Sequence, residues 1–273
     1  MCGILCCLSP TDEKIISFTD RLQKIKHRGP DETNITVVQS PNLTTFTCGF
    51  NRLAISNVLD GKQPIESKGW VHVHNGEFYN ATEKVEEYDE KYNDLVEKII
   101  NKDSYILENM TVEGAISFPK ELDGIFAYCS YHKDTETLFV ARDRFGVIPL
   151  YYVVETEQLA TANDDQIYER IWFASEAKAL IGLGDIHMFP PNTVMKVTLR
   201  NTNTIAAYHA HMETHEIHPP FPTENYYEPI KNVRMGRTQL YPDDFFIKLR
   251  EAVEKRRQCE VPWGTALSGG LDS

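Results

Sequence analysis

The sequence predicts an α+β domain with a core of two β-sheets, because strand-like segments outnumber helical ones through residue 200. These segments are rich in β-branched and aromatic residues and are separated by turn residues, as is typical of strands. They lie at residues 1–9, 35–38, 70–74, 124–131, 137–141, 148–154, 171–174 and 193–199. At 273 residues, 41% of them hydrophobic, the chain can bury a substantial core and has room for one large domain, or for one domain and part of another.

Helices are expected at three places in this strand-rich part. Apolar residues recur at helical spacing between residues 15 and 25, and that helix is expected to end at the turn of residues 27–30. Shorter helical segments are expected at residues 94–100 and 175–181.

The composition changes after the last predicted strand. Residues 209–229 are polar, contain prolines and show no periodicity, which indicates a linker. Beyond them, Pro242 at a first helical position begins an amphipathic stretch. We therefore expect one domain over residues 1–205, a linker over 206–240 and the beginning of a second domain over 241–273.

The charge excludes several classes of partner. With 28 basic and 40 acidic residues the net charge is −12, so nucleic acid and anionic membranes would be repelled at long range. The sequence has no apolar run of about 18 residues and no signal-peptide pattern. Its six cysteines are scattered, without metal spacing or a dense framework. A soluble cytoplasmic protein with reduced thiols is expected.

Cys2 follows the initiator methionine directly and is a candidate nucleophile. Removal of Met1 would leave a thiol and a free α-amine on one residue. An α-amine has a reference pKa of about 7.7–8.0, so it can relay the proton of the thiol near neutral pH and leave a thiolate. A Met-Cys start also fits an ordinary cysteine, and the rest of the sequence must decide between the two.

Three features of the sequence each have a structural and a functional explanation. Asn75 and Gly76 end the predicted strand of residues 70–74, where they form either a turn or a pair of donors to a developing oxyanion. Arg52 lies in an uncharged stretch and is either a surface arginine or a bidentate partner for a carboxylate. Asp94 either caps a helix, which the local sequence favours, or holds an ammonium group.

The last six residues, Ser-Gly-Gly-Leu-Asp-Ser over 268–273, follow an apolar strand-like segment. A glycine pair flanked by hydroxyl groups there can form a nest of backbone N–H groups for pyrophosphate, and the alternative is a plain turn. No Gly-Lys-Ser/Thr is present, so the loop is not a Walker A motif.

Other polar segments give weaker evidence about function. His209, His211, His215 and His218 lack a Cys or carboxylate partner at metal spacing, so solvated linker histidines are preferred to a metal site, and no metal ligand is expected. The charge-rich turns at residues 27–32 and 142–146 are either structural ion-pair corners or walls of a site.

Taken together, the motifs resemble those of glutamine-dependent asparagine synthetases of the class II amidotransferase type, and the resemblance covers essentially the whole chain. It rests on several segments that occur in this order: residues 1–4, 27–31, 75–80, 122–127, 141–152, 175–180 and 268–273. The resemblance implies an N-terminal-nucleophile hydrolase fold, a four-layer αββα sandwich of two antiparallel sheets. A linker and the truncated start of an α/β synthetase domain would follow it.

The same resemblance implies the catalytic roles. Cys2 would attack the side-chain amide of glutamine, and Asn75 and Gly76 would hold the oxyanion. Ammonia would leave behind a glutamyl thioester that water hydrolyses, and this reaction would need no cofactor.

Four further residues are implied as glutamine ligands. Arg52 would bind the α-carboxylate, Ile55 and Glu77 would line the pocket, and Asp94 would bind the α-ammonium group.

In a second site the family adenylates aspartate with ATP and Mg²⁺ before ammonia displaces AMP. The implied ATP-binding residues of this chain are Leu267, Ser268, Gly269, Gly270, Asp272 and Ser273. Glutamine, ATP and aspartate are thus the expected small-molecule partners, and a homodimer stays open.

The chain also departs from the family pattern. Phe50 stands where the family commonly has His, and Ser56-Asn57 stand where Val-Asp is usual. The segment between Glu77 and Asp94 is shorter than usual and poorly matched.

Since the sequence ends inside the predicted pyrophosphate loop, only the ammonia-producing half of the reaction is expected of it. The alternative is a degenerate amidotransferase-like module that binds glutamine or a partner without turnover.

Overall fold

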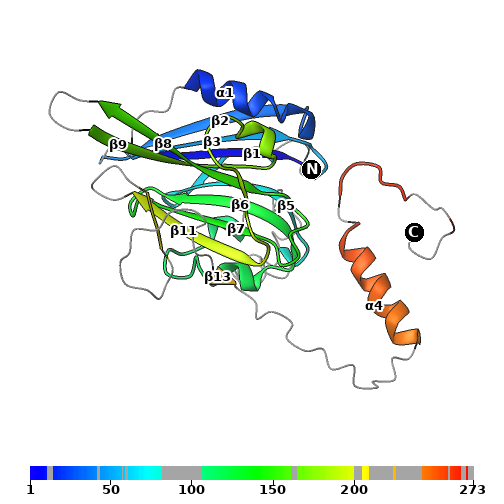
Figure 1. Cartoon of the computed structure of the whole chain (residues 1–273). Coiled ribbons are helices and arrows are strands. Elements are labelled where there is room, and N and C mark those ends of the chain that lie inside the picture. The colour runs from blue at the N-terminus through cyan, green and yellow to red at the C-terminus, as the bar shows by residue number, and fades with distance from the viewer. Residues whose placement is uncertain are drawn as a thin grey trace.

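The computed structural model contains two antiparallel β-sheets stacked face to face, with helix α1 (Ile15–Gln23) outside one of them (Figure 1). The C-terminal helix α4 (Pro242–Lys255) lies to one side of the sheets. The structure describes residues 1–10, 15–41, 44–56, 58, 61–81, 106–160, 165–199, 205–208, 224–225, 242–257, 259–265 and 269. The predicted α+β class with two sheets is confirmed.

The first sheet has the strand order β10-β8-β9-β1-β3-β2. Its strands are β10 (His187–Met188), β8 (Tyr151–Ala160), β9 (Asp165–Ala174), β1 (Gly3–Ser9), β3 (Thr45–Arg52) and β2 (Glu32–Gln39). The N-terminal strand β1 is central, because Leu5 pairs with Gly49 of β3 on one side and with Ala174 of β9 on the other. The residue just before β1 is therefore held at the end of a doubly paired strand.

The second sheet has the order β12-β11-β7-β6-β5-β4, and β13 pairs with β11. Its strands are β4 (Ile65–Ser67), β5 (Trp70–Phe78), β6 (Gly124–His132), β7 (Thr137–Arg142), β11 (Thr193–Leu199), β12 (Ile205–Tyr208) and β13 (Glu224–Asn225). The sheet thus extends into the range that the sequence analysis assigns to a linker, because β13 lies within that range and β12 crosses its start at residue 206.

The side chains of β1 alternate between two apolar clusters, as the two-residue period of a strand requires. Ile4, Cys6 and Leu8 face the core between the sheets, where they join residues of both sheets. Leu5 and Cys7 face the opposite side and pack under helix α1. Because both faces are covered, the strand reads as a continuous apolar run in the sequence.

Helix α1 covers the outer face of the first sheet, as its apolar spacing predicts. Phe18 and Leu22 are fully buried against this face, and the ring of Phe18 stacks on Trp172 at 5.9 Å between centroids. Gly49 of β3 lies directly beneath them, and a Cβ atom there would come within 2.6 Å of the Leu22 side chain. A glycine in the strand therefore sets how closely the helix approaches the sheet.

The outer face of the second sheet is covered by the segment before β6. Ile106, Leu107 and Phe118 of this segment pack against Trp70 and Phe126 of the sheet. The helix predicted at residues 94–100 lies outside the described residues.

The helical segment predicted at residues 175–181 is wrong, because the structure has only a short 3-10 turn, Ala177–Ala179. Ser175 is tied to β1 by two contacts: its N–H donates to the carbonyl oxygen of Ile4, and its Oγ accepts from the Ile4 N–H, both at 3.0 Å. Glu176 has an extended backbone, with φ −139° and ψ 137°. These strand-like ties hold the segment out of a regular helix.

Helix α4 carries its apolar side chains on the surface of the described structure. Those that are about half exposed or more are Phe245, Phe246, Ile247, Leu249 and Val253. None of the helices described here has both the length and the apolar content that a membrane crossing requires.

Candidate active site

One cavity of about 140 Å³ opens at the N-terminal end of β1. Six of the residues that the sequence analysis names as catalytic or glutamine-binding line it together: Cys2, Arg52, Ile55, Asn75, Gly76 and Glu77. They come from the residue just before β1, from the end of β3 and the loop after it, and from β5, so both sheets contribute to the cavity. The seventh, Asp94, lies outside the described residues.

The register of the first sheet places Cys2 in the cavity wall. Gly3 is the first paired residue of β1 and pairs with Asn51, so Cys2 lies just beyond the pairing, beside the end of β3. The N–H of Leu53 donates to Cys2 Sγ at 3.3 Å, and Sγ lies 3.7 Å from the carbonyl oxygen of Leu53. The backbone after β3 therefore fixes the position of the sulfur.

The environment of Cys2 acts on its protonation in two directions. Burial is the largest effect and raises the pKa of the thiol above its ordinary value. The hydrogen bond from Leu53, the N-terminal ammonium group and the charges of Arg52 and Arg28 act in the opposite sense without cancelling it. A base close to the sulfur is therefore needed to form the thiolate near neutral pH.

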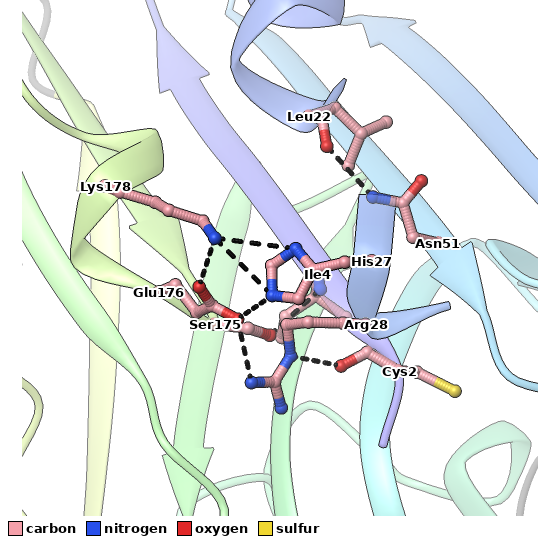
Figure 2. A network of polar contacts seen from close by, with 9 residues as sticks. All are labelled: Cys2, Ile4, Leu22, His27, Arg28, Asn51, Ser175, Glu176 and Lys178. Carbon is pink, nitrogen blue, oxygen red and sulfur yellow. Dashed lines mark hydrogen bonds and ion pairs between the residues drawn. The ribbon is translucent and has the colours of Figure 1, made fainter. Parts of the chain in front are cut away.

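A network of polar contacts anchors the main chain of Cys2 (Figure 2). Arg28 Nε donates to the carbonyl oxygen of Cys2 at 2.9 Å, and Arg28 Nη1 lies 3.2 Å from Glu176 Oε1. Glu176 also accepts from His27 Nε2 and Lys178 Nζ, each at 2.9 Å. Burial alone would raise the Glu176 pKa, but the hydrogen bonds from Lys178 and Arg28 outweigh it and hold this pKa below its usual value.

The turn at residues 27–32 is thus a support for the site. Its glycine, Gly29, approaches β3 so closely that a Cβ atom would collide with the backbone of Asn51. Its aspartate, Asp31, accepts from the N–H of Ala54 at 2.8 Å, and the Asp31 N–H donates to the carbonyl oxygen of Arg52 at 3.1 Å. The turn therefore holds both the residue before β1 and the loop after β3.

Asn75 and Gly76 have the features of an oxyanion-binding pair. Asn75 is 1% exposed, and its Nδ2 has no hydrogen-bond partner among the described residues. Gly76 has φ +128°, and a Cβ atom there would run into the carbonyl oxygen of Ile125. A buried amide donor without a partner is costly, and such a donor in a cavity wall is suited to a ligand oxygen.

Arg52 brings a cation to the cavity. It is 6% exposed, its Nη1 donates to the carbonyl oxygen of Val58 at 3.2 Å and lies 3.6 Å from Glu32 Oε2. A buried guanidinium fixed in this way suits a carboxylate ligand.

The turn at residues 142–146 is a structural corner. The guanidinium of Arg142 donates to the carbonyl oxygens of Ile148, Gly146 and Phe189. The carboxylate of Asp143 accepts from three backbone N–H groups, those of residues 145, 147 and 148. Because these bonds fix Ile148 outside a strand, β8 begins at Tyr151, later than the predicted start at residue 148. Ile148 itself lines the cavity.

Sequence reasoning did not assign roles to several residues of this site. The cavity is also lined by Met1, Phe50, Leu53, Ser56, Gly61, Gln63, His74, Ile125 and Ile148. Arg28 and Glu176 could have been found from the sequence, because they lie in the family motifs at residues 27–31 and 175–180. Leu53 could not, because it contacts Cys2 through its backbone and any residue type could do the same.

The predicted ATP-binding loop is described at one residue only. Gly269 is exposed and has φ +75°. Leu267, Ser268, Gly270, Asp272 and Ser273 lie outside the described residues, as does the histidine-rich stretch of residues 209–218. Within the described part of the chain, no three His, Cys, Asp or Glu side chains gather as a metal site would require.

Two stacked antiparallel sheets, with a cysteine just before the central strand of one of them, are the arrangement of the N-terminal-nucleophile hydrolase fold. The chain belongs to the family described as the glutamine amidotransferase domain, whose model matches residues 1–227. The predicted family is thereby confirmed.

The relatives of the chain in sequence are named as asparagine synthetases. It is 32% identical over 285 residues to "Asparagine synthetase [glutamine-hydrolyzing] 1" of Saccharomyces cerevisiae, aligned over 100% of this chain and 42% of the yeast protein. It is 30% identical over 291 residues to "Probable asparagine synthetase [glutamine-hydrolyzing]" of Acanthamoeba polyphaga mimivirus, over 100% of this chain and 48% of the viral protein. The chain thus spans about half the length of these curated relatives.

Solved structures share the fold at low sequence identity. One is titled "Structure of the allosteric regulatory enzyme of purine biosynthesis", with a TM-score of 0.54 and 15% identity over 77% of this chain and 49% of that chain. Another is a glutamine phosphoribosylpyrophosphate amidotransferase from B. subtilis, with a TM-score of 0.52 and 14% identity over 77% of this chain and 50% of that one. The predicted N-terminal-nucleophile hydrolase fold is confirmed.

Proposed function

We propose that this chain hydrolyses the side-chain amide of glutamine to glutamate and ammonia, with Cys2 as the nucleophile. The observation that carries the proposal is that Cys2 and the unpartnered Nδ2 of Asn75 belong to the same cavity wall. A nucleophile and an oxyanion donor must converge on one carbonyl group for acyl transfer.

Removal of Met1 is the first requirement of this mechanism. With Met1 in place, the nitrogen of Cys2 is an amide and cannot accept a proton, and Met1 itself lines the cavity. Its removal would free an α-amine beside the thiol and open the cavity. The amine would take the proton of the thiol, directly or through water, and so offset the effect of burial on the thiol pKa.

The chemical steps then follow from the cavity wall. The thiolate attacks the amide carbon of glutamine, and the oxygen of the tetrahedral intermediate accepts hydrogen bonds from Asn75 Nδ2 and the Gly76 N–H. The Cys2 ammonium group returns its proton to the leaving nitrogen, and ammonia departs as the C–N bond breaks. Water adds to the resulting thioester, glutamate is released and the thiol is regenerated.

Substrate orientation is assigned to the remaining lining residues. Arg52 binds the α-carboxylate of glutamine, and Ile55 and Glu77 contact the rest of the amino acid. Asp94 stays the predicted ligand of the α-ammonium group.

We further propose that this ammonia serves the ATP-dependent conversion of aspartate to asparagine in a longer protein. The names of the relatives and the predicted pyrophosphate loop at residues 268–273 support this assignment. Under it, residues 1–205 form the glutaminase domain and residues 241–273 begin the synthetase domain. ATP and Mg²⁺ belong to that second reaction, and no step of glutamine hydrolysis is assigned to them.

A cytoplasmic location is retained as part of the proposal, since all six cysteines are free in the structure.

Ammonia release from glutamine by the purified chain tests the first proposal, with the N-terminal residue identified by mass spectrometry. We expect turnover in the protein that has lost Met1, and its loss in Cys2→Ala. A contrary result would be glutamine binding in calorimetry together with ammonia release no greater than that of Cys2→Ala. It would favour the alternative, a degenerate amidotransferase-like module that binds glutamine without turnover.

A further inference from the structure

The chain returns to the rim of the Cys2 cavity shortly after helix α4 ends. The N–H of Glu260 donates to the carbonyl oxygen of Ile55 at 3.0 Å. The Oε2 of Glu260 accepts from the N–H of Val58, also at 3.0 Å. One residue therefore bonds to the cavity-rim loop, defined here as residues 53–56 and 58, at two places.

The cavity-rim loop carries two features of the proposed glutamine site. Ile55 lines the cavity, and the carbonyl oxygen of Val58 accepts from Arg52 Nη1 at 3.2 Å. Two hydrogen bonds to the main chain of Val58, one at its N–H and one at its carbonyl oxygen, thus link Glu260 to the Arg52 guanidinium. Movement of Val58 would remove one of the bonds that orient this cation.

The end of α4 is itself attached to the segments that flank the cavity. Lys255 Nζ lies 2.8 Å from Asp123 Oδ2, and the guanidinium of Arg256 lies 4.5 Å from the ring centroid of Tyr79. Tyr79 and Asp123 are joined by a backbone hydrogen bond of 2.6 Å, and Tyr79 directly follows β5, the strand that bears Asn75. These contacts bring Glu260 to the cavity-rim loop from the side of β5.

Glu260 is exposed, so its contribution comes from the position of its bonds and not from burial. Of the other contacts of the loop, the bond between the Ile55 N–H and the Leu53 carbonyl oxygen is internal to it. Asp31 holds Ala54, at the opposite end from Val58. Val58 is thus held from outside the loop by Glu260 and by Arg52.

We propose that Glu260 is a positioning residue for glutamine binding. By holding Val58 and Ile55 it keeps the Arg52 guanidinium and the rim of the cavity in the arrangement that accepts the α-carboxylate of the substrate. This inference rests on the proposed hydrolysis of glutamine at Cys2. It adds that residues beyond the matched family region, residues 1–227, complete the substrate site.

The first test separates substrate binding from chemistry in the full chain. In Glu260→Ala we expect the KM for glutamine to rise about fivefold while kcat changes less than about twofold, because the thiol and the oxyanion donors are untouched. Glu260→Gln keeps an acceptor for the Val58 N–H and should restore most of the wild-type KM. The matched control is Glu251→Ala, which removes an exposed glutamate of α4 that pairs with Lys248 and not with the loop.

The second test does not depend on turnover and measures solvent exchange of the Val58 amide by NMR. We expect faster exchange in Glu260→Ala than in Glu251→Ala and in the wild-type chain, because the Val58 N–H loses its acceptor. Unchanged exchange together with an unchanged KM would overturn the inference. If the wild-type chain does not hydrolyse glutamine but the Val58 amide still exchanges faster in Glu260→Ala, the result would support the positioning of the loop and refute the proposed function.

Discussion

Arg28 and Cys2 are joined by a 2.9 Å hydrogen bond from the guanidinium Nε to the carbonyl oxygen, so the main chain of Cys2 is held from the turn before β2. Arg28 is in turn held by Glu176, which lies after β9 on the other side of β1. The main chain of Cys2 is therefore held by a pair of side chains that come from the turn before β2 and from the segment after β9.

Arg28→Ala is expected to lower kcat about tenfold or more, because the sulfur loses a fixed position relative to the oxyanion donors. Steady-state ammonia release measures this. Arg28→Lys keeps the charge but not the planar fork that reaches both partners, so it should recover little activity. Full activity in Arg28→Ala would show that the Leu53 contact alone positions the sulfur.

Asn75→Ala is expected to lower kcat about 10²–10³-fold and to leave the free energy of unfolding close to that of the wild type, because the Asn75 amide donates no hydrogen bond to the described protein. The contrast is Asn80→Ala. Asn80 donates to the carbonyl oxygen of Glu121 at 2.8 Å and accepts from the N–H of Asp123 at 3.0 Å. Asn80→Ala should therefore lower the free energy of unfolding more than it lowers kcat. Urea unfolding distinguishes this variant from Asn75→Ala. Equal kcat values in Asn75→Ala and Asn80→Ala would contradict the proposed role of Asn75 as an oxyanion donor.

Gly76→Ala is expected to lower the free energy of unfolding by about 3 kcal/mol or more, since the methyl group meets the carbonyl oxygen of Ile125 in an unfavourable backbone conformation. Gly182→Ala is the matched control. Gly182 has φ +88°, and a Cβ atom there meets no neighbour within 4 Å. This substitution should cost about 1 kcal/mol, from the backbone conformation alone. Equal destabilisation of the two variants would show that Gly76 is required only for its φ angle.

The alkylation rate of Cys2 by iodoacetamide in the chain that retains Met1 should rise with pH through a midpoint above that of an exposed cysteine. Burial raises the thiol pKa, so the reactive thiolate forms only at higher pH. Arg52→Met removes a charge that lowers this pKa, so it should move the midpoint further upward. Mass spectrometry of the Cys2 peptide follows the reaction, and a midpoint at or below that of free cysteine contradicts the prediction.

The fold could be predicted best in segments whose apolar residues follow a single regular pattern. The spacing of Phe18, Leu22 and Ile25 predicted helix α1, and the apolar run of residues 1–9 predicted β1. The sequence analysis missed β3 as a strand, although it is central, because its end carries Gly49, Asn51 and Arg52. These residues have low strand propensity or a polar group. Gly49 allows the approach of α1, Asn51 donates to the carbonyl oxygen of Leu22 in α1, and Arg52 lines the cavity.

The site was predictable to the extent that side-chain chemistry is local. Cys2, Arg52 and the Asn75-Gly76 pair were singled out by residue type, and the structure brings them to one cavity. The contribution of Glu260 could not be predicted from spacing, because it depends on how α4 returns to the cavity-rim loop.

Cys2, the proposed nucleophile, follows Met1 directly and precedes β1, a strand that is paired on both sides and covered on both faces. Chain ends usually fray at little cost, but β1 can separate from β3 and β9 only if the two sheets and α1 lose their shared packing. Displacement of β1, the strand that anchors Cys2, should therefore require almost the full free energy of unfolding. The backbone amides of Leu5 to Cys7 should therefore exchange with solvent among the slowest in the protein. The strand next to Cys2 would then be one of the least mobile parts of the molecule.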